Sequence, residues 1–145
     1  MKIFELGHIV FYVSNLIRSA DFYKNILGFQ EIHRDLHTAL FSSGRTHHEL
    51  LLIEIGGTAP KKEYPQPGLY HVGFKIGTTD KELRDAITEL RAHGVTIVGS
   101  ADHHVTHSLY ILDPDNNELE LYIDVDESWR EDVSKILKPP KQLVL

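Results

Sequence analysis

Residues 6–13, LGHIVFYV, and residues 69–76, LYHVGFKI, are two related stretches that decide how this chain folds. Each is rich in β-branched and aromatic residues, which is typical of a β-strand. Each is followed by a capped segment with helical spacing, which ends at LGF in the first case (27–29) and at HGV in the second (93–95). The chain therefore contains an internal repeat of about 60 residues.

The first half of the repeat is predicted to contain one strand, one helix and three further strands. The first strand covers residues 2–13, because its apolar residues are large, aromatic or β-branched. Ser14 or Asn15 is expected to cap the helix, and Gly28 is expected to end it. Three further strands are predicted at 29–37, 38–43 and 47–55.

The second half repeats this order after a predicted loop at 56–68, which is rich in glycine, proline and charge. Residues 69–77 are predicted to form its first strand. Thr79 is expected to cap the helix, and Gly94 is expected to end it. Three further strands are predicted at 95–99, 107–112 and 118–124.

The repeat predicts an α+β fold in which two βαβββ modules form one domain. Each module is too short to bury a good core alone, so we expect a single domain over residues 1–125, with modules at about 1–57 and 68–125. Residues 126–145 are expected to form a tail. Its short amphipathic helix, predicted over 127–137, would pack either on its own domain or on a partner subunit.

The composition of the 145-residue chain argues against several classes of function. Its formal net charge of −6 disfavours a nucleic-acid or anionic-membrane partner. No apolar run reaches the ~18 residues of a membrane-spanning helix, and the N-terminus lacks the basic start and cleavage site of a signal peptide. Cysteine is absent, so neither a disulfide nor a thiolate nucleophile is possible. We expect a cytoplasmic protein, although a secreted bacterial protein could also lack cysteine.

Two of the 10 histidines stand at equivalent positions of the repeat, His8 in the first stretch and His71 in the second. A pseudo-twofold axis would bring the two strands side by side, so both histidines could enter one cavity as metal ligands. Glu120, in the stretch ELELY, adds a carboxylate. Two histidines and one carboxylate form the facial triad that leaves open positions on Fe(II). Alternatively, Glu118 and Glu120 are only the solvated face of a strand.

A hairpin is predicted upstream of Glu120. Residues 113–117, DPDNN, are typical of a turn, because proline presets its own φ and Asp and Asn tolerate left-handed geometry. The turn joins the strand with Tyr110 to the strand with Glu120, so these two residues can be cross-strand neighbours. His103 stands where the hairpin begins. A histidine, a tyrosine and a glutamate are therefore expected to gather at one end of a sheet.

This pattern resembles the vicinal oxygen chelate superfamily, which includes glyoxalase I and bleomycin-resistance proteins, and within it the type I extradiol ring-cleaving dioxygenases. The dioxygenase signature runs from a histidine through Leu-Tyr-x-x-Asp-Pro-x-Gly to a metal-binding glutamate. The chain departs from it at Asn116, which replaces the glycine but also visits the left-handed conformation. The resemblance covers nearly the whole chain and implies a half-barrel around a metal site. The matching residues are, in order, His103, Leu109, Tyr110, Asp113, Pro114 and Glu120.

The resemblance also implies a role for each site residue. His48 would be the acid–base histidine beside bound oxygen, with His47 as the weaker candidate. His103 and Tyr110 would hold the hydroxyl oxygens of the substrate and assist proton transfer. The implied metal ligands are His8, His71 and Glu120.

The implied reaction is cleavage of a catechol-type aromatic diol by O2, next to its two hydroxyl groups. The implied cofactor is Fe(II); Mn(II) would fit the same ligands, and Ni or Zn could substitute. The related enzymes often have four βαβββ modules, whereas this chain has two. Exposed strand edges and an apolar tail also predict a homodimer. The sequence leaves the identity of the diol open.

Two rival functions exist within the superfamily. Glyoxalase I-like members hold Zn or Ni with a histidine and a glutamate from each half, which here would be His8, Glu54, His71 and Glu120. His48 and Glu54 share a predicted strand but lie about 20 Å apart along it, so only one of them can face the metal. The His103–Tyr110 signature favours His48. The other rival is a metal-free resistance protein that binds an apolar ligand without turnover.

Overall fold

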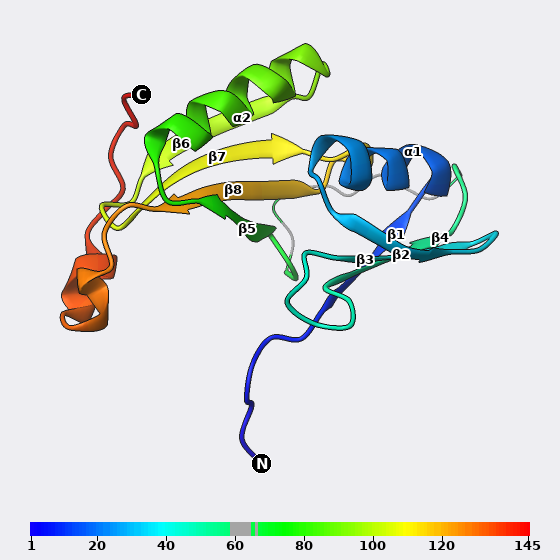
Figure 1. Ribbon diagram of the computed structural model, residues 1–145, viewed down its shortest axis with the longest axis horizontal. Coiled ribbons are helices and arrows are strands. Elements are labelled where there is room, and N and C mark those ends of the chain that lie inside the picture. Colours follow the sequence, from blue (N-terminus) through cyan, green and yellow to red (C-terminus); the bar gives the residue numbers. More distant parts are fainter. Residues whose placement is uncertain (59–64, 66) are drawn as a thin grey trace. The chain divides into compact units, whose positions relative to one another are not determined.

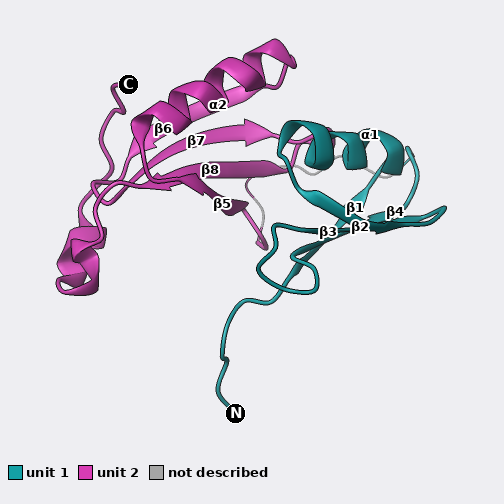
Figure 2. Ribbon diagram, in the orientation of Figure 1, with its two compact units in different colours: residues 1–62 teal, residues 63–145 magenta. Residues whose placement is uncertain are grey.

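Figure 1 shows the computed structural model of the chain, which describes residues 1–58, 65 and 67–145. The chain divides into two units, Met1–Lys62 and Glu63–Leu145, which have separate colours in Figure 2. Within the predicted loop at 56–68, positions 59–64 and 66 lie outside the described residues.

The first unit is a four-stranded mixed sheet with one helical segment. The sheet has the strand order β1-β4-β3-β2, in which β1 is parallel to β4 and the other neighbours are antiparallel. The helical segment follows β1 and consists of α1 (Leu16–Asp21) and a π-helical turn, η1 (Phe22–Ile26). The strands are β1 (Ile9–Val13), β2 (Gln30–Arg34), β3 (Thr38–Ser42) and β4 (Leu50–Glu54).

The second unit has the same plan. Its sheet order is β5-β8-β7-β6, again with the first strand parallel to the last and the other neighbours antiparallel. The helix α2 (Asp80–Ala92) follows β5. The predicted α+β class with two βαβββ modules is therefore confirmed. The strands are β5 (His71–Gly77), β6 (Ile97–Asp102), β7 (Thr106–Leu112) and β8 (Glu118–Asp124).

The helix ends follow from the residues at their caps. The Asn15 side chain accepts a backbone N–H from the first turn of α1, and Thr79 forms a reciprocal capping box with Glu82 at the start of α2. Gly28 and Gly94, with φ of 75° and 67°, follow the two helical segments in the left-handed conformation that glycine adopts without strain. In the described part of the chain, no helix has the length and apolar character needed to cross a membrane.

The strand β8 shows how one face of the second sheet is buried and the other is left for a site. Figure 1 shows α2 on one side of this sheet. Glu118 and Glu120 alternate with the buried residues and lie on the other face, as the period of two predicts. The buried apolar residues of β8 are Leu119, Leu121 and Ile123.

The predicted first strand at 2–13 is too long. The regular strand begins at Ile9, which pairs with Leu50, the first residue of β4. A strand needs a partner for its backbone groups, and β4 supplies none before that pair. The apolar residues Ile3 and Phe4 are largely exposed in an irregular N-terminal segment. Residues 2–8 therefore form no strand in this unit, although their residue types favour one, because none of the described strands pairs with them.

The tail segment 127–137, predicted as one short helix, is helical in two separate pieces. The segment forms two 3-10 helices, η2 (Ser128–Arg130) and η3 (Val133–Leu137). Asp132 separates them with an extended backbone, and its side chain accepts the N–H of Ser134. Asp favours such local caps over a helix interior, which explains the interruption.

Candidate functional site

In the second unit, His71 and Glu120 bring a ring nitrogen and a carboxylate oxygen together. His71 begins β5, and Glu120 lies in the parallel neighbour β8, opposite Gly73. The Nε2 of His71 is 3.3 Å from Oε2 of Glu120, and its Nδ1 is 3.7 Å from Oε1 of Glu118. Both carboxylates lie on the face of β8 opposite its buried leucines.

This pair fits two ligands of one metal ion. Nitrogen and oxygen ligands about 2.1 Å from an ion and at right angles to each other lie about 3 Å apart, close to the 3.3 Å separation seen here. Nδ1 of His71 is buried without a hydrogen-bond partner, a state that costs about 1–3 kcal/mol. Metal-bound histidines commonly turn their second nitrogen to a carboxylate, which Glu118 could provide. The donor set therefore suits a divalent cation.

Tyr110 and His103 lie beside this pair in the same unit. Tyr110 is the cross-strand neighbour of Glu120, as the hairpin predicted, and its hydroxyl is 2.8 Å from Nε2 of His103. The Tyr110 and His71 ring centroids are 5.7 Å apart. Burial, followed by the nearby carboxylate of Glu120, raises the pKa of Tyr110 to about 12. The phenol therefore keeps its proton at neutral pH and can donate a hydrogen bond.

The DPDNN turn sets this register. The Asp113 carboxylate accepts the backbone N–H groups of Asp115 and Asn117, at 2.9 Å and 2.8 Å. Asn116 has φ of 65°, so it adopts the left-handed conformation that glycine would take in the dioxygenase signature. The replacement of glycine by Asn116 therefore keeps the backbone shape of the turn.

In the first unit, His8 and His48 lie together. His8 comes directly before β1, and His48 lies just before β4. Because Ile9 pairs with Leu50, both histidines are at the same end of this parallel strand pair. Their ring centroids are 4.6 Å apart. His47 is farther from His8, at 6.5 Å, but its Nδ1 is 2.6 Å from Nδ1 of His48.

The surroundings of His48 favour its neutral form. Burial lowers the pKa of His48, and the neighbouring rings of His47 and His8 lower it further. An unperturbed histidine has a pKa of about 6.5, so His48 is mostly uncharged at pH 7. A neutral imidazole can accept a proton and return it, as an acid–base residue must.

Glu54 lies at the opposite end of the same strand pair. It is paired with Val13, and its Oε1 accepts the backbone N–H of Leu16 at 3.1 Å, at the start of α1. Four residue steps separate Ile9 from Val13, about 13 Å along the strand. His48 lies before β4 rather than within it, so the predicted strand at 47–55 is too long. The predicted separation of His48 from Glu54 nevertheless holds.

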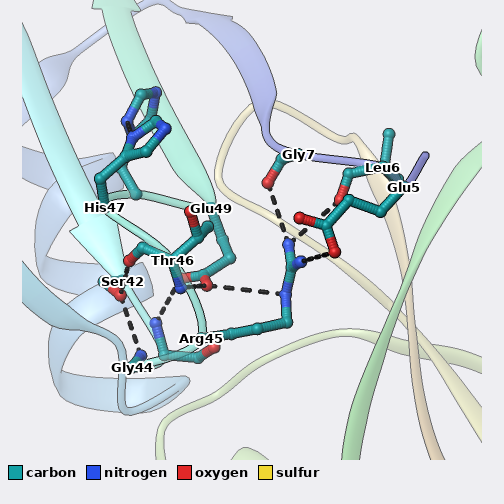
Figure 3. Close-up of polar contacts among 11 residues, drawn as sticks. Glu5, Leu6, Gly7, Ser42, Gly44, Arg45, Thr46, His47 and Glu49 are labelled. Carbon is teal, nitrogen blue, oxygen red and sulfur yellow. Dashed lines mark hydrogen bonds and ion pairs between the residues drawn. The ribbon is translucent and has the colours of Figure 1, made fainter. Parts of the chain in front are cut away.

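The loop between β3 and β4, which carries His47 and His48, is fixed by Glu49 (Figure 3). Its Oε1 accepts the N–H of Thr46 and its Oε2 the N–H of Ser43, both at 2.7 Å. The Ser42 hydroxyl donates to the carbonyl oxygen of Thr46 at 3.0 Å. The side chains of Glu49 and Ser42 therefore hold the backbone of the loop that carries the two histidines.

Arg45 links this loop to the segment that leads into His8 (Figure 3). Its Nη2 donates to the carbonyl oxygens of Leu6 and Gly7, at 3.2 Å and 2.9 Å. Arg45 and Glu49 were not among the predicted site residues, although they flank the two histidines in the stretch RTHHE. The arginine and glutamate on either side of the two histidines were the available signal, because such charged side chains can hydrogen-bond the backbone of the loop that carries the histidines.

The two units thus place the predicted site residues in two groups. His8 and His48 lie together in the first unit, whereas the second unit brings together His71, Glu120, Tyr110 and His103. Over residues 1–58, 65 and 67–145, no three His, Asp or Glu side chains converge on a single metal position. Two of the three predicted ligands, His71 and Glu120, are adjacent within one unit.

The chain was compared with known proteins by sequence. It is 36% identical over 130 residues to the catechol-2,3-dioxygenase of Bacillus subtilis, which covers 88% of this chain and 45% of that protein. It is 31% identical over 121 residues to biphenyl-2,3-diol 1,2-dioxygenase 3 of Rhodococcus globerulus, which covers 83% of this chain and 63% of that protein. The chain therefore spans less than two thirds of the length of either relative.

A solved structure with a similar fold and a family model also match the chain, and both agree with the relatives found by sequence. The fosfomycin resistance protein FosX of Listeria monocytogenes has a TM-score of 0.67 and 24% identity, with 87% of this chain and 98% of that chain covered. This likeness concerns the fold alone. Residues 5–121 match the Glyoxalase/Bleomycin resistance protein/Dioxygenase superfamily. The match covers most of the chain, so the protein belongs to this superfamily, as its repeat and its hairpin signature predicted.

Proposed function

We propose that the protein is an Fe(II)-dependent extradiol dioxygenase, which opens the ring of a catechol-type aromatic diol with O2. The observation that carries the proposal is the arrangement in the second unit, where the His71–Glu120 pair lies beside the hydrogen-bonded His103–Tyr110 pair. Two relatives, at 36% and 31% identity, support it, because both are named as dioxygenases of aromatic diols.

The proposed metal ligands are His8, His71 and Glu120. Two neutral imidazoles and one carboxylate suit Fe(II), and Mn(II) would fit the same donors. When bound there, the ion would supply open coordination positions for the diol and O2 and electron density for the reaction. The 3.3 Å approach of His71 to Glu120 supports the assignment of these two residues.

The residues beside the ligands would orient the diol and move its protons. The Tyr110 hydroxyl keeps its proton, because its pKa is about 12, and can donate to a substrate oxygen. His103, 2.8 Å from that hydroxyl, can accept or return a proton through Nε2. His48 is mostly neutral at pH 7, and its Nδ1 faces His47, which leaves Nε2 to exchange a proton near the reacting oxygen. Positioning of this kind contributes strongly to rate.

The glyoxalase I-like alternative requires Glu54 as a ligand together with His8. Glu54 instead accepts the first N–H of α1, at the far end of the strand pair that carries His8. His48 has the place beside His8, with ring centroids 4.6 Å apart. This difference supports the dioxygenase over the four-ligand isomerase.

The proposed partners are a small aromatic diol and O2, with neither nucleic acid nor membrane. The cytoplasmic location and the homodimer stay predictions, as does the closure of both modules into one half-barrel domain.

The test is a diol-cleavage assay on protein purified anaerobically with Fe(II). Catechol and 2,3-dihydroxybiphenyl are added with oxygen, and the yellow ring-fission product is followed by absorbance. We expect product from the wild-type chain and a loss of at least ~100-fold in His48→Ala, with His33→Ala as an exposed-histidine control. Product at the same rate in His48→Ala would contradict the assigned role. No product from any diol, together with methylglyoxal–thiol isomerisation lost in Glu54→Gln, would favour the rival.

A further inference from the structure

The end of the chain returns to the β6–β7 hairpin in the second unit. Lys141 and Asp102, the last residue of β6, form an isolated antiparallel bridge. Asp102 donates its N–H to the carbonyl oxygen of Lys141 at 3.0 Å and accepts the N–H of Lys141 at 2.9 Å. Leu143, two residues later, is buried. The tail is therefore docked on the hairpin rather than merely adjacent to it (Figure 1).

The Asp102 side chain extends this contact into the turn between the two strands. Its Oδ1 accepts the backbone N–H of His104 at 2.7 Å. Its Oδ2 is 3.2 Å from Nζ of Lys141 and 3.5 Å from Nε2 of His107. His107 in turn has its Nδ1 2.6 Å from the carboxylate of Asp80, the first residue of α2. One carboxylate thus connects the tail, the turn and the neighbouring strand.

His104 is bound to the tail as well. Its φ is 70°, an uncommon value for a residue with a side chain, so the turn must be held in this shape by its contacts. The Nε2 of His104 donates to the carbonyl oxygen of Pro139 at 3.0 Å. Both residues that flank His103 are therefore attached to the same short stretch of tail, Pro139 to Lys141.

His103 lies between these two attachment points. Its own backbone N–H donates to the carbonyl oxygen of Thr106 at 2.8 Å, and its ring reaches the Tyr110 hydroxyl at 2.8 Å. A ring at the tip of a turn keeps one direction only if the backbone on either side is fixed. Here the tail fixes that backbone on both sides.

We propose that residues 139–141 act as a brace that orients His103 toward Tyr110, with Asp102 and His104 as the positioning residues through which the brace acts. The inference rests on the proposed function, in which the His103–Tyr110 pair holds the diol. It adds a role for the C-terminal tail in substrate binding. Without the brace, the turn loses the contacts that hold Asp102 and His104 to the tail and keeps the bonds made within the unit's strands and turn, so the His103 ring is no longer fixed toward Tyr110.

The test compares two substitutions at one position. Lys141→Pro removes the N–H that Asp102 accepts, whereas Lys141→Ala removes the ammonium group with its aliphatic stem and keeps both backbone bonds. The first readout is the imidazole 15N NMR signal of His103 in the protein without added substrate. We expect this signal to move and broaden in Lys141→Pro and to stay near its wild-type position in Lys141→Ala.

The second readout separates positioning from general stability. We expect Lys141→Pro to raise the KM for the diol about tenfold, with a smaller fall in kcat and an unchanged affinity for Fe(II). An unchanged His103 signal and KM in folded Lys141→Pro would overturn the brace. If Lys141→Pro does not fold, His104→Gly removes the bond to Pro139 and relieves the left-handed strain, and the same readouts apply. If no diol is cleaved by the wild-type chain, the proposed function fails, while the NMR comparison still decides the brace.

Discussion

At the scale of single residues, Gly73 leaves the space that the Glu120 carboxylate occupies. The two residues are paired between β5 and β8. A Cβ atom at position 73 would lie 3.3 Å from Oε2 of Glu120 and 3.5 Å from the Tyr122 ring. The 3.3 Å separation is tight for a Cβ contact, so the Glu120 carboxylate would have to shift by a few tenths of an ångström, whereas the distance to the ring is an ordinary contact. The lack of a side chain at position 73 therefore leaves room for the Glu120 carboxylate, whereas the backbone conformation there does not require glycine.

We expect Gly73→Ala to weaken Fe(II) binding about tenfold, because it displaces a ligand whose direction is set by its neighbours. Fold stability should change little, since glycine in a strand is replaced by a residue with less backbone entropy to lose. Anaerobic titration with Fe(II) measures the effect. Gly57→Ala, where the added methyl group meets open space, is the control. If Gly73→Ala and Gly57→Ala bind Fe(II) with equal affinity, then either Glu120 is not a ligand or the added Cβ at position 73 does not displace its carboxylate.

At the scale of elements, the loop between β3 and β4 depends on Arg45. This side chain donates to the carbonyl oxygens of Leu6 and Gly7, which belong to a segment without regular structure. Its Nε is also 3.7 Å from Oε1 of Glu49. Arg45 thus connects the residues before His8 to the loop with His48.

Replacement of Arg45 by Met keeps the aliphatic stem and removes the donors. We expect Arg45→Met to weaken Fe(II) binding roughly tenfold while the midpoint of thermal unfolding falls only slightly, because the lost bonds are partly exposed. The measurement is Fe(II) affinity beside the unfolding midpoint. The control is Arg34→Met, which loses an ion pair to Glu31 in β2. A loss of affinity no greater than in Arg34→Met would contradict the link to His8.

The start of α2 gives a prediction about pH. The Glu82 carboxylate accepts the backbone N–H groups of Thr78 and Thr79, both at 2.9 Å, and the Thr79 hydroxyl at 2.7 Å. The backbone N–H of Thr78 and the Thr79 hydroxyl are the main causes of its lowered pKa. A lowered folded-state pKa means that this stabilisation is present above the unfolded value of about 4.3 and is lost as pH falls through the folded value.

We therefore expect Glu82→Gln to lower the unfolding midpoint at pH 7, with the difference from wild type shrinking as the pH approaches about 3. Thermal unfolding followed by circular dichroism across this range measures it. Glu89→Gln, on the same helix but away from its start, serves as the control. A difference that stays constant with pH would rule out an ionised cap.

Much of the element plan could be predicted from local chemistry. The strand β8, the Asn15 and Thr79 caps and the Tyr110–Glu120 pairing depend on neighbours in sequence or on one turn, and all were found. The first strand was overextended because propensity does not report whether a partner strand is present. Arg45 and the Lys141–Asp102 bridge were missed because they join residues about 40 positions apart, which no periodicity reveals.

At the scale of the whole molecule, two units with the same strand order carry different parts of the proposed site. His8 belongs to the first unit, and His71 and Glu120 belong to the second. Each unit alone supplies fewer than three of the proposed ligands. An ion bound by all three would therefore link the stability of the two units.

We expect saturating Fe(II), under anaerobic conditions, to raise the unfolding midpoint by about 9 °C, because binding at about 100 times Kd contributes about 2.7 kcal/mol and a chain of this length unfolds with an entropy of about 0.3 kcal/mol per kelvin. The shift should vanish in both His8→Ala and Glu120→Ala and persist in His33→Ala. Differential scanning fluorimetry is the measurement. A shift that survives in His8→Ala but not in Glu120→Ala would mean that the second unit binds the ion alone.

The most direct test of the proposed function is the stoichiometry of oxygen use. An oxygen electrode and the absorbance of the ring-fission product are read together, with Fe(II)-loaded protein, a diol and no added reductant. We predict that one O2 is consumed for each diol opened, that no hydrogen peroxide forms, and that both signals are lost in Glu120→Ala. Oxygen uptake that yields peroxide with the ring intact, or an unconsumed diol despite bound Fe(II), would contradict the dioxygenase.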